Sequence, residues 1–96
     1  MSDFPIPVNV TFTAPIGITI KGDVWNCIEV PDSATLFGTK KGVRVDAEMD
    51  GIPLNNVALM VTGMGGHMFS TNAKLRKELG KDIGDMVTIR IIQRTK

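Results

Sequence analysis

The sequence predicts a mostly β domain, a small β-barrel with two short helices. Three observations support this prediction. Apolar and polar residues alternate over several short runs, which is the period of a strand with one buried face. The two helix-sized segments between these runs each end at a glycine. A larger unit occurs twice along the chain at a constant offset.

The strands follow one another at short intervals. We expect them at residues 8–13, 16–20, 24–30, 43–49, 52–54, 57–61 and 87–91, with a further strand that begins near residue 68. Asp50 and Gly51 lie between two of these runs and are a strong signal for a two-residue hairpin turn. Trp25 is the only tryptophan, and we expect it to pack at the barrel wall.

Both predicted helices have recognisable ends. The first spans residues 32–37, and Gly38 closes it as a left-handed cap. Either Thr71 or Asn72 caps the second helix, and Gly80 ends it. A short helix that must reverse tightly needs a residue that tolerates positive φ, which explains the two glycines.

The two helices belong to a repeated strand–helix–strand unit. At one offset Gly38 aligns with Gly80 and Gly42 with Gly84. The same offset places Val45, Ala47 and Met49 on Val87, Ile89 and Ile91. One such unit cannot bury its apolar face alone, whereas two can close on each other and remove exposed sheet edges. We therefore expect a double-split β-barrel made of two pseudo-repeated β-α-β halves; the alternative is an ordinary β-α-β chain with two glycine caps.

Composition indicates one globular domain over residues 1–96, with a loose segment at 1–7. The sequence is 43% hydrophobic and 22% charged, which is typical of a soluble protein. No apolar run reaches the roughly 20 residues of a spanning helix, and we find no secretory signal. Cys27 is the single cysteine, so no internal disulfide can form, and we expect a cytoplasmic protein that needs no membrane.

A glycine-dense loop beside the only histidine is the main candidate site. Gly63, Gly65 and Gly66 precede His67, and such glycines let a ligand approach the backbone and leave N–H groups for an anion. Asn72 follows at a helix start, where the dipole also favours anions. We expect a small polar ligand here, with His67 as a pH-dependent donor. The alternative is a β-turn whose histidine is exposed or hydrogen-bonded.

Charge is unevenly distributed although the net charge is only +1. Residues 72–96 hold seven basic and three acidic residues, whereas residues 1–71 hold four basic and seven acidic ones. The possible anion or nucleic-acid patch consists of Lys74, Arg76, Lys77 and Arg90. The alternative is a solvated helix face with a basic C-terminus.

These residues favour a non-enzymatic module that binds a small ligand or a protein partner. No Ser-His-Asp order, carboxylate pair or metal-ligand spacing is convincing, so no catalytic residue, metal or cofactor is predicted. A nucleic-acid-binding protein is the alternative, and a small enzyme that uses His67, with Cys27 or Asp85, is a further one. A monomer suffices for the predicted fold, and the sequence is also compatible with a dimer.

Residues 71–80 and 83–87 resemble one half of the AbrB/MazE-type swapped-hairpin domains, in which a helix, Gly-x-x-x-Gly-Asp and a strand follow one another. That resemblance implies DNA-binding dimers. Here both halves lie in one chain, so the barrel needs no partner subunit.

A second resemblance covers nearly the whole chain. It is carried by residues 12–14, 28–31, 43–45, 50–53, 63–68, 75–77 and 84–87, together with Trp25. These resemble the prokaryotic family called domain of unknown function nineteen-oh-five. The resemblance implies a stand-alone double-split β-barrel and an accessory or binding role, and it carries no catalytic residues.

Overall fold

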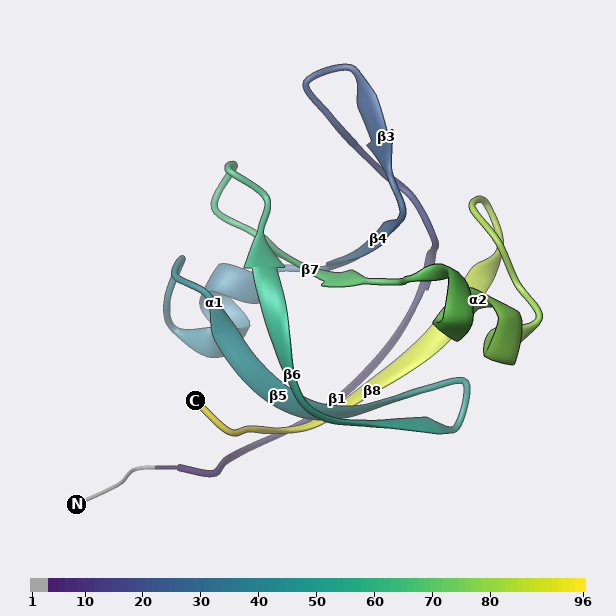
Figure 1. Ribbon diagram of the computed structural model, residues 1–96. Helices are drawn as coiled ribbons and strands as arrows, with labels where there is room; N and C mark the ends of the chain where they lie inside the picture. The colour runs from purple at the N-terminus through teal and green to yellow at the C-terminus, as the bar shows by residue number, and fades with distance from the viewer. Residues whose placement is uncertain (1–3) are drawn as a thin grey trace.

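The computed structural model describes residues 4–96 and shows a strongly curled, six-stranded antiparallel sheet with a separate two-stranded hairpin (Figure 1). In chain order the elements are β1 (Ile6–Pro15), β2 (Ile18–Ile20), β3 (Asp23–Trp25), β4 (Cys27–Val30), α1 (Ser33–Phe37), β5 (Val43–Met49), β6 (Ile52–Val61), β7 (His67–Ser70), α2 (Ala73–Leu79) and β8 (Met86–Arg94). The large sheet has the order β1-β8-β5-β6-β7-β4. The mostly β prediction with two short helices is confirmed.

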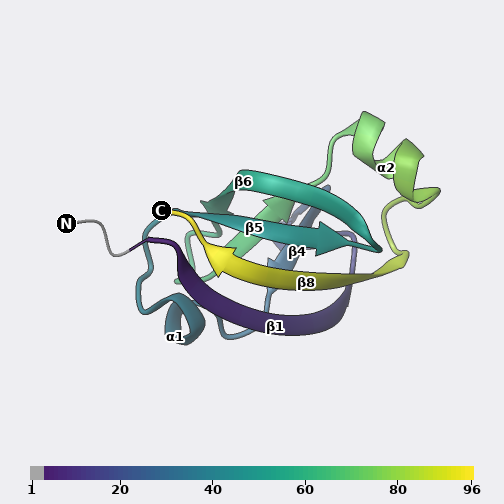
Figure 2. The ribbon, with the colours of Figure 1, turned by 90° about the horizontal axis from the view of Figure 1, so that it is seen from below.

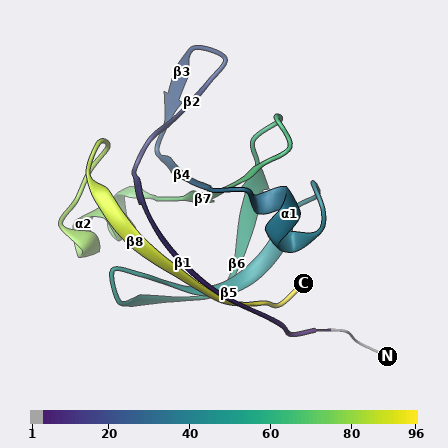
Figure 3. The same ribbon diagram turned by 180° about the vertical axis from the view of Figure 1, so that it is seen from behind.

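The sheet curls into a half-barrel whose two edge strands are β1 and β4 (Figures 1 and 2). Viewed from behind, β1 runs up to the β2–β3 hairpin, and β4 leaves the base of that hairpin (Figure 3). Among the described residues, no ladder joins β1 to β4. The expectation that the barrel removes its own edges is therefore wrong, because the hairpin diverts the chain between the two strands.

The concave face of the sheet holds the main core. Alternate residues of β5 and β8 point inward, which is the period-two pattern visible in the sequence. The fully buried residues include Val45, Met49, Phe69, Ile89 and Ile91. A smaller cluster of Ile18, Cys27 and Met68 lies between the β2–β3 hairpin and strands β4 and β7.

The turns and caps follow the sequence closely. Asp50 and Gly51 have φ angles of 50° and 85° and connect β5 to β6, so the predicted hairpin is confirmed. Gly38 and Gly80 are both left-handed at the ends of α1 and α2. Asn72, rather than Thr71, caps α2, since its Oδ1 accepts the Leu75 N–H at 2.8 Å.

Several boundaries differ from the predictions; the strands predicted at 52–54 and 57–61, for example, form the single strand β6. The single strand predicted at 24–30 is divided at Asn26 into β3, which pairs with β2, and β4, which pairs with β7. Trp25 consequently lies on the projecting hairpin and is 42% exposed, so its predicted place at the barrel wall is wrong. Within segment 1–7, Ile6 and Pro7 belong to β1, where they pair with β8; residues 1–3 lie outside the described part.

Candidate functional site

An apolar pocket opens where β6 separates from β7. The two strands pair only at Met60 with Met68 and at Val61 with His67, after which β6 follows β5 alone. The space that opens between β6 and α2 measures about 340 Å³. It is lined by Leu54, Val57, Ala58, Phe69, Ser70, Asn72, Lys74, Leu75 and Glu78. We call it the β6–α2 pocket.

A bulge in β6 opens this pocket. Val45 pairs with Val57 and Ala47 with Leu54, so two residues of β6, Asn55 and Asn56, lie opposite Asp46 alone. Asn56 is left-handed at φ 51°, and the Asp46 carboxylate accepts its N–H at 2.8 Å. The side-chain hydrogen bond from Gln93, followed by that N–H, lowers the pKa of Asp46. An ionised Asp46 therefore fixes the bulge.

Helix α2 forms the opposite wall. Its Leu75 and Leu79 lie four residues apart and pack against the core, which makes one face of the helix apolar. The Arg76 guanidinium donates to the Thr71 carbonyl, and the left-handed Gly80 closes the last turn through the Arg76 and Lys77 carbonyls. The helix is thus fixed at both ends beside the opening.

The pocket combines an apolar interior with a polar rim. Phe69 is only 2% exposed and belongs to the main core, so the pocket reaches down to the half-barrel interior. Asn72, Lys74 and Glu78 supply an amide, an ammonium and a carboxylate. The Asn72 side-chain oxygen accepts the Leu75 N–H of the helix cap, whereas the Asn72 amide nitrogen has no hydrogen-bond partner within residues 4–96. This arrangement suits a ligand with an apolar body and a polar end.

The glycine-dense loop is closed on itself. Thr62 N–H donates to the Gly66 carbonyl at 3.0 Å, and the Thr62 hydroxyl accepts from the N–H groups of Met64 and Gly66. Gly63 and Gly65 have positive φ angles, as this tight turn requires. Two of the loop N–H groups that the sequence offers to an anion are therefore used internally.

His67 lies in the core rather than at the surface. Its Nδ1 is 2.8 Å from the Ser33 hydroxyl, and its Nε2 is 2.7 Å from the Lys41 carbonyl oxygen. Its ring meets Phe37 edge-on at 5.1 Å, and the residue is fully buried. The hydrogen-bonded alternative considered for this histidine matches the structure.

The predicted site residues are consequently divided among three places. Asn72 lines the β6–α2 pocket, and Gly65 and Gly66 line a separate hollow with Met64. His67 is fully buried and lines neither of these spaces.

The walls of the β6–α2 pocket were missed by sequence reasoning. The Asn55-Asn56 interruption between two apolar runs was the one available signal for them.

A family comparison can now be set beside this geometry. The model of the family described as Domain of unknown function (DUF1905) matches residues 12–91. The chain belongs to the DUF1905 family. No curated protein matches the sequence. The matched range contains the β6–α2 pocket, the glycine loop and both helices, so all candidate features belong to the family's domain.

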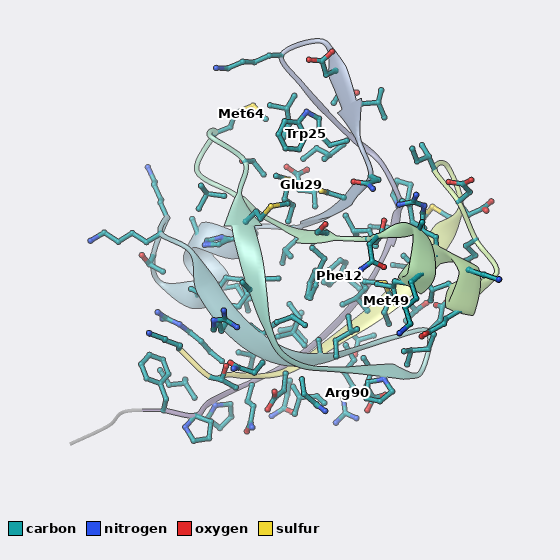
Figure 4. The ribbon with its side chains drawn as sticks, in the orientation of Figure 1. Phe12, Trp25, Glu29, Met49, Met64 and Arg90 are labelled. Carbon is teal, nitrogen blue, oxygen red and sulfur yellow. The ribbon has the colours of Figure 1, made fainter. Side chains whose placement is uncertain are left out.

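The four basic residues do not form one patch in this DUF1905 domain. Lys74 lies at the rim of the β6–α2 pocket. Arg76 pairs with Asp82 at 3.5 Å and, with Lys77, lines another hollow that also contains Asp85. Arg90 lies on β8, between its strand partners on β1 and β5, below the half-barrel in Figure 4.

The groups named for an enzyme are not brought together around His67. Its ring nitrogens contact Ser33 and Lys41, not Cys27 or Asp85. Burial raises the pKa of the Cys27 thiol, and a hydrogen bond with Ser70 opposes this only in part. Residues 4–96 contain no cluster of metal-binding side chains and no helix long and apolar enough to cross a membrane.

Proposed function

We propose that this DUF1905 domain is a non-enzymatic, cytoplasmic binding module that holds a small amphipathic acid in the β6–α2 pocket. One observation carries the proposal: an apolar space that reaches the core through Phe69 and has three polar side chains at its rim. Its volume of about 340 Å³ falls within the range of small-molecule sites.

The apolar interior supplies the affinity. Leu54, Val57 and Leu75 are only half-buried, so a ligand could remove their remaining surface from water. Burying about 100 Å² of apolar surface contributes roughly 2.5 kcal/mol. The β6 bulge and the capped helix hold the walls in place, which lowers the ordering cost of binding.

The rim supplies the preference for an acid. The Lys74 ammonium attracts a carboxylate, and the Asn72 amide can donate a hydrogen bond to it. Glu78 also lines the opening, one helical turn beyond Lys74, so its carboxylate disfavours ligands with a second acidic group.

Titration calorimetry with three related probes tests this proposal. Phenylpropionate, phenylpropanol and phenylpropylamine share one apolar body and differ in charge. We expect the acid to bind most tightly, then the alcohol, then the amine. Lys74→Gln should remove the advantage of the acid over the alcohol, and Lys77→Gln, one turn further round the helix, serves as the control. An amine preference would contradict the assignment of the rim.

The architecture supports a finer proposal about the fold. Gly38 and Gly80 close α1 and α2 in the same conformation, and the repeat-related strands β5 and β8 pair with each other, Ala47 with Ile91 and Met49 with Ile89. We propose that the half-barrel is a double-split barrel of two related halves, complete in one monomer.

A further inference from the structure

The two edge strands of the half-barrel leave a gap. The Gly17 N–H donates to the Cys27 carbonyl at 2.8 Å, which links the turn after β1 to the start of β4. Beyond it, no ladder closes the sheet within residues 4–96. An unpaired strand edge can accept another strand.

The ladder between β4 and β7 shows which backbone groups face this gap. Thr71 N–H donates to the Asn26 carbonyl, so these two residues form a hydrogen-bonded pair. Hydrogen-bonded and non-bonded pairs alternate in an antiparallel ladder. Glu29, opposite Met68, is therefore in a non-bonded pair. Its N–H and C=O point away from β7 and into the gap.

The β1 side of the gap is also unpaired. Ile16 exchanges backbone hydrogen bonds with the β8 side through Asp85 and Gly84. By the same alternation, the N–H and C=O of Thr13 face away from β8. Their hydroxyls support this assignment, since the Thr13 and Thr88 Oγ1 atoms lie 3.1 Å apart across a close, non-bonded pair.

A groove runs along the gap on the outer face of β4. Its larger part, about 450 Å³, is lined by Ala14, Pro15, Gly17, Ile18, Thr19, Glu29, Pro31 and Met64. A smaller hollow of about 270 Å³ shares Glu29, Pro31 and Met64 with it. In Figure 4 the labelled Trp25, on the hairpin, and Met64, on the loop, are drawn above Glu29.

The groove has large apolar side chains and an acidic floor. Met64 lines both hollows and is 69% exposed, and Trp25, the strand partner of the lining residue Ile18, is 42% exposed. Glu29 and Asp32 are the charged residues among those lining the two hollows, and neither forms an ion pair within residues 4–96. The Lys40 side chain lies beside Gly65, but Lys40 lines neither hollow.

We infer that an extended peptide segment of a partner protein, carrying a lysine or arginine beside an apolar residue, adds to the free edge of β4. The Glu29 backbone supplies two main-chain hydrogen bonds. The Glu29 carboxylate pairs with the basic side chain, and Met64 and Trp25 cover the neighbouring apolar residue. Exposed methionine favours a surface that accepts different apolar groups.

Selection from a random heptapeptide display library tests this inference. We expect enrichment of peptides with a lysine or arginine flanked at alternate positions by apolar residues. A selected peptide should change the fluorescence of Trp25, the only tryptophan, and shift the Glu29 amide resonance. A copy methylated at the backbone nitrogen that faces Glu29 should lose most of its affinity, because a main-chain donor is removed. No enrichment, or enrichment of acidic peptides, would overturn the inference.

Variants separate this groove from other sites. Glu29→Gln should weaken the selected peptide about fivefold, the loss of one exposed charge pair, whereas Glu48→Gln, on β5, should change nothing. Phenylpropionate binding at the β6–α2 pocket should be unaffected by Glu29→Gln. The proposals for the pocket and for the groove are therefore tested independently. If the Glu29 amide shifts with protein concentration and no peptide, a second copy fills the gap, and the peptide assignment is overturned.

Discussion

The Nδ1 of His67 lies 2.8 Å from the Ser33 hydroxyl, so the only histidine of the chain joins β7 to the start of α1. Because the Lys41 carbonyl is an acceptor, Nε2 must donate to it. The Ser33 oxygen also accepts the His67 N–H at 2.8 Å. The His67 ring, the Ser33 hydroxyl and the Lys41 carbonyl thereby all have hydrogen-bond partners in this junction.

We predict that His67→Ala costs about 3 kcal/mol in the free energy of unfolding. The substitution removes buried ring volume and leaves the Ser33 hydroxyl and the Lys41 carbonyl without their partner. Urea denaturation measures this loss. Ser33→Ala should cost less, about 1 kcal/mol, since it leaves the ring in place. Unchanged stability of His67→Ala would show that the histidine is not a structural link.

Acid should weaken the contact between the β5–β6 turn and β8. The side-chain hydrogen bond from Lys81, followed by the Thr88 N–H, lowers the pKa of Asp50 below its ordinary value. A lowered folded pKa stabilises the protein above the unfolded pKa, and this contribution disappears as the pH falls through the folded value.

Asp50→Asn tests that pH dependence. Above about pH 5 the variant should be less stable than the native protein by roughly 1 kcal/mol, because the site is partly exposed. The difference should shrink as the pH falls below about 4. Thermal unfolding over this pH range checks it, and a difference that stays constant with pH would assign the effect to geometry instead of charge.

Substitutions of Asn72 should separate the helix cap from the ligand site. Asn72→Asp keeps the oxygen that accepts the Leu75 N–H and removes the amide donor. We expect near-native stability with weaker phenylpropionate binding. Asn72→Ala removes the cap as well and should cost about 1 kcal/mol of stability. If Asn72→Asp binds the acid as tightly as the native protein, the amide does not contact the ligand.

Random-sequence DNA should not be retarded in a gel shift, even at low salt. Of the four basic residues considered, Arg76 is paired with Asp82, and Arg90 lies on a different element from Lys74 and Lys77. A scattered arrangement gives little release of counterions. A salt-dependent shift would instead favour the nucleic-acid alternative.

Local sequence patterns predicted most of the fold. Apolar and polar residues alternate cleanly over 43–49 and 87–91, and these segments form the buried centre of the sheet. Gly38 and Gly80 end the two helices, and Asp50-Gly51 forms the β5–β6 turn, as the sequence predicts. Closure of the barrel could not be predicted in this way. It depends on the change of strand partner at Asn26, since β3 pairs with β2 whereas β4 pairs with the distant β7.

The candidate sites were harder to predict for the same reason. The glycines before His67 suggest an open loop in the sequence, but the Thr62 hydroxyl closes that loop. Ser33 and Lys41 bind the His67 ring. Both are far from His67 in the sequence, so no local motif announces these contacts. The β6–α2 pocket arises from the loss of pairing between β6 and β7, and no single motif encodes that event.

Methyl NMR during titration with phenylpropionate tests the central claim most directly. We predict shifts confined to Leu54, Val57 and Leu75, which line the β6–α2 pocket. Ala58→Phe fills the pocket and should abolish them, whereas Ala73→Phe, in the hollow on the other side of α2, should leave them unchanged. Equal shifts in Ala58→Phe and the native protein, or shifts located elsewhere, would contradict the pocket as the ligand site.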